Sequence, residues 1–147
     1  YWGLYEGNEK LLGKILGTNY KDGTSPEAIA KVAQRFGLGA EIKENCELED
    51  LEQAIKNKQP PIANFQAWSE SEHPDYKHNE SDGHYAIVVG MDKDRVYFRD
   101  PSIYNKIGVL SKKSFLERWH DGRDSRRAAI FFDGKSPAKD DEFEEID

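Results

Sequence analysis

Apolar residues recur every three or four positions in the N-terminal part of the chain, and this spacing predicts three helices. Residues 8–17 (NEKLLGKILG) carry leucine and isoleucine at helical spacing and stop at a glycine. Residues 26–36 contain an i, i+3, i+4, i+7 stripe of Ile, Val, Ala and Phe. Residues 48–59 (LEDLEQAIKNKQ) present a leucine and isoleucine face and are halted by Pro60 and Pro61. All predicted strands except the one at residues 38–45 follow these three helices along the chain.

The second of these helices has the most complete start and stop signals. Thr24 and Glu27 have the spacing of a capping box, in which each side chain bonds a backbone N–H of the other residue. Pro26 suits the first helical turn, and Gly37 suits the exit. We therefore expect the Thr24 and Glu27 pair to cap this helix. The aromatic pair and glycine of residues 1–4 (YWGL) are typical of the end of a further helix.

The second half of the chain changes to the alternation and composition of β-strands. Strands are predicted for the segments LGAEIKEN (38–45), PIANFQAW (61–68), HYAIVVGM (84–91), VYFRD (96–100), IGVL (107–110) and AAIFF (128–132). A short helix within 111–120 carries Phe115, Leu116 and Trp119 on its inner side. Helices first and an antiparallel sheet later indicate an α+β fold.

The length and charge of the chain limit its organisation and partners. A chain of 147 residues with 37% hydrophobic content is suited to one compact domain, which we assign to residues 1–134. Residues 135–147 form an acidic tail that we expect to be disordered. Six acids and one lysine lie in its segment KDDEFEEID, which leaves about −2 of the net charge of −7 for the rest.

Several partner classes are disfavoured by the same features. No basic stripe is present that would release phosphate counterions, so we expect no nucleic-acid partner. No run approaches the ~20 apolar residues that span a bilayer, so we expect no membrane partner. The single cysteine, Cys46, excludes an internal disulfide and favours a reducing compartment, and we expect a cytoplasmic location.

The segment SDGHYAIVVGMDKDRVYFRDPS contains the strongest candidate chemistry. If its two apolar runs pair as a hairpin around DKDR, His84 and Asp100 fall near the same end of neighbouring strands. A carboxylate that accepts the Nδ1 proton of an imidazole holds its tautomer and stabilises the charged ring, as a histidine beside a nucleophile requires. The alternative is a surface histidine at a strand start and an ordinary Asp-Pro turn. Spacing alone leaves both interpretations open.

The motifs as a set resemble the double-glycine leader peptidases and their stand-alone relatives, a bacterial branch of the papain-like cysteine peptidases. The matching segments are YWG, LLGTNYKDGTSPEAIAKVAQRFGL, LEDLEQAIKNKQPPIANFQAW, DGHYAIVVGMDKDRVYFRDPS and SFLERWHD, which occur in the family's order. The resemblance implies a papain-like fold in which His84 and Asp100 are catalytic triad residues. It also implies a peptide or protein as the substrate.

The family also carries a Cys-Gly at the start of the helix that ends in the Tyr-Trp-Gly stretch, and an oxyanion-hole glutamine shortly before it. Both positions would lie upstream of Tyr1, the cysteine by roughly three helical turns. One interpretation is truncation or processing of a cysteine peptidase, and the other is an inactive peptide-binding module of the same fold. We expect the first, with the upstream segment or self-association covering the core that the missing helix would expose.

Other candidates have weaker support in the sequence. Cys46 is positioned near a predicted helix start, which lowers a thiol pKa, but four acidic residues near it oppose a thiolate. Gln66 can project toward the site or support a neighbouring backbone. The tryptophans are most simply core or groove-wall residues. We expect no cofactor and no metal, because the loop residues His73, Asp75, His78 and Asp82 lack a recognisable ligand spacing.

Overall fold

The computed structural model describes residues 5, 7–19, 21, 23–121 and 126–134. The predicted helix end at residues 1–4 and the acidic tail at residues 135–147 lie outside the described residues. The chain divides into two compact units, one made of Tyr1–Glu41 with Phe132–Asp147 and the other of Ile42–Phe131. The candidate site belongs to the second unit.

The first helix of the smaller unit, α1 (Glu9–Leu16), begins and ends as the sequence predicts. Asn8 is its N-cap, and the Asn8 side-chain oxygen accepts a hydrogen bond of 2.8 Å from the Leu11 backbone N–H. Gly17 ends the helix with a φ of 69°, a left-handed conformation that costs glycine little. The predicted glycine stop is therefore confirmed.

The second helix, α2 (Pro26–Arg35), starts one residue later than the predicted capping box requires. Ser25 is the N-cap, and its hydroxyl accepts a hydrogen bond of 3.1 Å from the Ala28 N–H. The Thr24 hydroxyl instead contacts the Thr18 hydroxyl. The prediction that Thr24 caps this helix is wrong because Pro26 occupies the first helical position, which makes the residue before it the cap.

A six-stranded sheet has the order β1-β6-β2-β3-β4-β5. Its strands are β1 (Gly39–Lys43), β2 (Ile62–Gln66), β3 (Gly83–Met91), β4 (Arg95–Arg99), β5 (Gly108–Ser111) and β6 (Ala129–Asp133). Strand β2 pairs antiparallel with β3 and β6, and β4 pairs antiparallel with β3 and β5. All six predicted strands are present, and the α+β class is confirmed.

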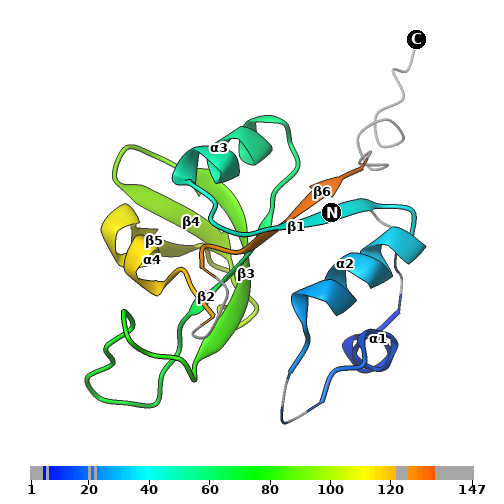
Figure 1. Ribbon diagram of the computed structural model, residues 1–147, viewed down its shortest axis with the longest axis horizontal. Coiled ribbons are helices and arrows are strands. Elements are labelled where there is room, and N and C mark those ends of the chain that lie inside the picture. The colour runs from blue at the N-terminus through cyan, green and yellow to red at the C-terminus, as the bar shows by residue number, and fades with distance from the viewer. Residues whose placement is uncertain (1–4, 6, 20, 22, 122–125, 135–147) are drawn as a thin grey trace. The chain divides into compact units, whose positions relative to one another are not determined.

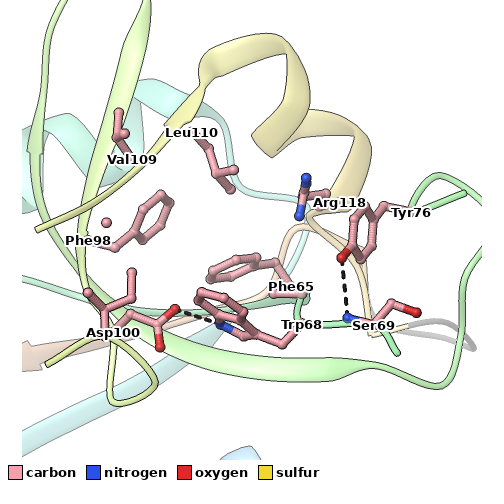
Figure 2. A pocket seen from close by; sticks show the side chains of 12 residues that line it. Phe65, Trp68, Ser69, Tyr76, Phe98, Asp100, Val109, Leu110 and Arg118 are labelled. Atoms are coloured by element: carbon pink, nitrogen blue, oxygen red, sulfur yellow. Dashed lines mark hydrogen bonds between the residues drawn. The ribbon is translucent and has the colours of Figure 1, made fainter. Parts of the chain in front are cut away.

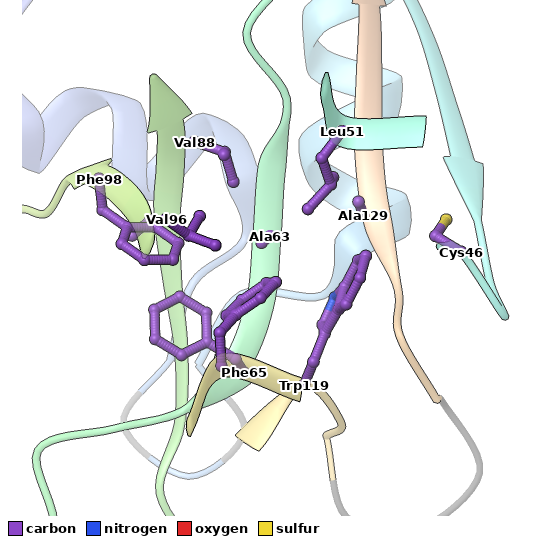
Figure 3. Close-up of a cluster of buried hydrophobic side chains, with 11 residues drawn as sticks. Cys46, Leu51, Ala63, Phe65, Val88, Val96, Phe98, Trp119 and Ala129 are labelled. Carbon is purple, nitrogen blue, oxygen red and sulfur yellow. The ribbon is translucent and has the colours of Figure 1, made fainter. Parts of the chain in front are cut away.

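In the larger unit, helices α3 (Leu48–Lys56) and α4 (Lys112–Arg118) contribute to one apolar core on the sheet (Figures 1 and 3). The side chains of Leu51 and Phe115 are completely buried. The rings of Phe115 and Trp119 stack with centroids 4.8 Å apart. The Trp119 indole N–H donates to the Ala128 carbonyl at 2.9 Å, so this buried ring leaves no polar group unpaired.

Helix α3 ends earlier than the sequence predicts. Its last helical residue is Lys56, and Lys58 turns the chain away with a φ of 57°. The prolines at positions 60 and 61 follow this turn and do not themselves stop the helix. Among the residues that the structure describes, no helix is both long and apolar enough to cross a membrane.

The position of the α2 cap can be tested by two substitutions. Ser25→Ala removes the acceptor for the Ala28 N–H and should lower the free energy of unfolding by about 1 kcal/mol. Thr24→Ala, the matched control, should cost clearly less because its hydroxyl contact is exposed. Urea unfolding of both variants measures the difference. A larger loss for Thr24→Ala would show that the cap is misassigned.

Candidate active site

His84 and Asp100 lie on the same face of the sheet, at the ends of neighbouring strands. His84 is the second residue of β3, and Ala86, two residues further, is buried in the core. Asp100 directly follows β4, and Phe98, two residues earlier, is buried in the same core. Because alternate side chains of a strand share a face, the apolar face continues into a histidine on one strand and an aspartate on the next.

The two side chains meet at hydrogen-bonding distance. His84 Nε2 lies 2.9 Å from Asp100 Oδ1, and the two side chains are only 17% and 7% exposed. The predicted contact is present, but the predicted ring nitrogen is wrong, because Nε2 faces the carboxylate instead of Nδ1. The Phe65 ring packs edge-on against the imidazole, with centroids 5.8 Å apart. Among the described residues Nδ1 has no hydrogen-bond partner, so this nitrogen is the one able to accept a proton.

Three donors surround the Asp100 carboxylate. Oδ1 accepts the Ser102 backbone N–H at 2.8 Å in addition to His84. Oδ2 accepts the Trp68 indole N–H at 3.0 Å, the bond that Figure 2 shows. Burial raises the pKa of Asp100, but the hydrogen bonds from Ser102, Trp68 and His84 outweigh this effect, and the pKa lies below its ordinary value. The carboxylate is therefore ionised and able to stabilise a positively charged imidazole.

A pocket of about 280 Å³ adjoins Asp100. Its walls are largely aromatic and aliphatic, and include Phe65, Trp68 and Val109 (Figure 2). The Arg118 guanidinium, also part of the lining, lies 3.8 Å from the centroid of the Tyr76 ring. Such a mixture of apolar surface with few polar groups is typical of a ligand-binding site.

Gln66 supports the backbone beside the site. Its side chain is completely buried, its Oε1 accepts the Asp82 N–H at 2.9 Å, and its Nε2 donates to the His120 carbonyl at 3.1 Å. These two bonds use both ends of the amide. Gln66 therefore ties the chain entering β3 to the chain leaving α4, and the second of the two roles open at the sequence level is the one observed.

Cys46 has the properties of a structural thiol. It is 3% exposed, and its Sγ lies 3.5 Å from the Lys43 carbonyl. Burial, followed by the nearby Asp50 carboxylate, raises the pKa of the thiol to about 11. A thiol that stays protonated at neutral pH is a poor nucleophile.

The loop histidines do not converge on a metal site. His78 Nδ1 lies 2.7 Å from Asp75 Oδ2, but both side chains are exposed. The Asp82 carboxylate is bonded instead to the Asn79 amide. Within the described ranges, no group of three or more His, Cys, Asp or Glu side chains is arranged to hold a metal ion.

Trp68 is the residue whose contact with the site was not predicted. The sequence suggested a core or groove-wall residue, and Trp68 does line the pocket with its side chain 56% exposed, but the bond from its N–H to Asp100 was not predicted. A partial signal was available, because Trp68 follows β2 at the end where β2 pairs with the first residues of β3. The backbone geometry that turns its indole toward Asp100 could not be read from the sequence.

The chain belongs to the Peptidase_C39-like family, whose model matches residues 3–125. Among solved structures, the peptidase domain of Streptococcus ComA, a bifunctional ABC transporter involved in a quorum-sensing pathway, is similar with a TM-score of 0.62. The two are 21% identical, and the match covers 89% of this chain and 81% of that domain. No curated protein matches the sequence significantly.

A second similar structure is described as a C39-like peptidase from Bacillus anthracis. It has a TM-score of 0.57 and 20% identity, and the match covers 78% of this chain. The chain spans only 61% of the length of that relative. At these identities the two structures establish the fold, which is that of C39-like cysteine peptidases with their papain-like combination of helices and antiparallel sheet.

The environment of Asp100 predicts a pH-dependent contribution to stability. Because its pKa is lowered on folding, ionised Asp100 stabilises the folded state above the ordinary value of 3.8, and this contribution disappears as the pH falls through the lower folded value. Urea unfolding of the wild type and of Asp100→Asn should therefore give a difference that shrinks as the pH falls below 3.8. A difference that grows in that acidic range would contradict the assigned environment.

Proposed function

We propose that the complete protein is a cysteine peptidase in which His84 is the general base and acid and Asp100 orients it. The observation that carries this proposal is the bond of 2.9 Å between His84 Nε2 and Asp100 Oδ1 in a protein of the C39-like family. The nucleophile in this proposal is the upstream cysteine that the family resemblance implies, and Cys46 is a poor substitute because burial raises its pKa to about 11. A cytoplasmic location remains part of the proposal.

The geometry favours a defined path for the proton. The upstream thiol transfers its proton to His84 Nδ1, and the resulting thiolate attacks the carbonyl carbon of the scissile peptide bond. The imidazolium, stabilised by Asp100, then gives the proton to the leaving amine as the C–N bond breaks. Water, deprotonated by the same imidazole, hydrolyses the thioester and restores the thiol.

The pocket next to Asp100 supports a peptide with an apolar side chain as the substrate. Its volume of about 280 Å³ is close to the lower limit for small-molecule sites, so one large side chain fills it better than an extended segment. Asp100 does not compete for polar groups of the substrate, because both of its oxygens already accept hydrogen bonds. The similarity to the ComA peptidase domain supports a peptide as the general substrate class.

Substitution of His84 in the complete protein tests the proposed function. With a mixed peptide library and mass spectrometry of the products, His84→Ala should lower the cleavage rate by a factor of roughly 10² to 10⁴. His78→Ala is the matched control, because His78 also bonds a carboxylate but at an exposed position. Cys46→Ala should likewise leave the rate unchanged.

One result would reject the peptidase, and another would reject only the upstream nucleophile. Binding of peptides without any cleavage would establish the inactive binding module, and loss of cleavage in Cys46→Ala with retained folding would make Cys46 the nucleophile.

The role of the pocket predicts an effect on substrate binding. Val109 is half exposed and lines the pocket, so Val109→Lys should place a charge there without disturbing the core. We expect KM for a cleaved peptide with an apolar residue to rise about tenfold, with kcat little changed. Ile107→Lys is the control, because Ile107 is similarly exposed but is not part of the lining. Equal effects of both variants would argue against the pocket.

A further inference from the structure

Trp68 has an unusual combination of backbone conformation and exposure. Its φ is 60°, in the left-handed region that bulky residues rarely adopt, and its side chain is 56% exposed. Neither property favours folding, since the backbone is strained and a large apolar ring stays in water. Strain of this kind persists only where the surrounding structure enforces it, and it is concentrated at functional sites.

The indole N–H, which is the one polar group of the Trp68 side chain, bonds to Asp100. This Nε1–H donates to Asp100 Oδ2 at 3.0 Å (Figure 2). Oδ1 accepts from His84 and from the Ser102 backbone. Among the described residues, Trp68 is the sole donor to Oδ2. The carboxylate of an aspartate rotates easily about its Cβ–Cγ bond, so donors on one oxygen alone would not fix the orientation of its plane. A donor on each oxygen defines the plane.

We propose that Trp68 is a positioning residue, whose indole N–H holds Asp100 Oδ2 so that Oδ1 stays directed at His84 Nε2. The left-handed turn at Trp68 follows from this role. The Ala67 N–H is bonded to the Asp82 carbonyl at 3.0 Å, so the chain is still tied beside β3 one residue before the turn. The turn then directs the indole toward the end of β4, two strands away in the sheet.

Fixing the Asp100 carboxylate also fixes the tautomer of the His84 imidazole. When Asp100 Oδ1 accepts the proton of Nε2, the neutral ring carries its proton on Nε2 and leaves Nδ1 unprotonated. A carboxylate that is free to rotate would no longer enforce that tautomer. Among the described residues, Asp100 is the only charged group bonded to His84. The loss of catalysis expected from this change rests on the proposed function, whereas the change of tautomer does not.

The test compares Trp68→Phe with Tyr76→Phe in the complete protein. Trp68→Phe keeps an aromatic ring but removes the donor to Oδ2. Tyr76→Phe also removes a polar group from an aromatic side chain in the pocket lining, but that hydroxyl contacts the Ser69 N–H and not Asp100. Circular dichroism and thermal unfolding establish that both variants are folded.

The first measurement is the ¹⁵N and ¹H NMR spectrum of the histidine rings, with His84 assigned from its absence in His84→Gln. The wild type and Tyr76→Phe should show His84 as the Nε2–H tautomer with a slowly exchanging N–H. Trp68→Phe should show a mixture of tautomers and fast exchange of this proton. An unchanged His84 spectrum in folded Trp68→Phe overturns the proposal.

The second measurement is peptide cleavage, which separates this inference from the proposed function. Trp68→Phe should lower kcat by about tenfold with KM little changed, as expected for loss of one hydrogen bond to a charged group. If the wild type cleaves no peptide while the tautomer still changes in Trp68→Phe, the peptidase function fails and the positioning role stands. If the wild type is active and Trp68→Phe has the same kcat and spectrum, the positioning role fails.

Discussion

Packing of aromatic side chains on one face of the sheet is the interaction on which the site depends. Phe65 on β2 and Phe98 on β4 have ring centroids 5.2 Å apart, and Phe115 of α4 lies 5.6 Å and 5.4 Å from them. These contacts cross β3 and hold the three strands in register. Because a shift of one residue would turn every side chain of a strand to the other face, the same packing places His84 and Asp100 on a common face.

At the end of this sheet face, the buried Asp100 carboxylate has hydrogen-bond donors on both of its oxygens. A buried carboxylate is costly unless donors surround it, and Asp100 has one donor on Oδ2 and two on Oδ1. The exposed pair of His78 and Asp75 has a similar distance, 2.7 Å, without such surroundings. Distance alone therefore does not distinguish the two pairs. The difference lies in burial, since the side chains of His84 and Asp100 are 17% and 7% exposed and those of His78 and Asp75 are 74% and 67% exposed. Asp100 also lines a pocket.

The backbone around the site is held by side chains that do not themselves react. Gln66 connects the Asp82 N–H to the His120 carbonyl, so the start of β3 and the end of α4 cannot move independently. Since the amide is completely buried, removing either bond would leave a polar group without water. The Trp119 indole, bonded to the Ala128 carbonyl, likewise joins the residue after α4 to the residue before β6. A precise histidine position is what general acid–base chemistry requires.

Local features were determined by the sequence itself, and through-space contacts by the tertiary structure. Periodicity and turn residues predicted the order of helices and strands, because such signals act within a few positions. The hairpin spacing also predicted that His84 would meet Asp100. The choice of Nε2 and the Trp68 donor were not predicted, since each depends on backbone angles or on how separate segments approach. The Ser25 cap, in contrast, follows from a local signal, Pro26 at the first helical position, although the capping-box pattern pointed to Thr24. The two possible roles of Gln66 were likewise separated only by bonds to residues 16 and 54 positions away.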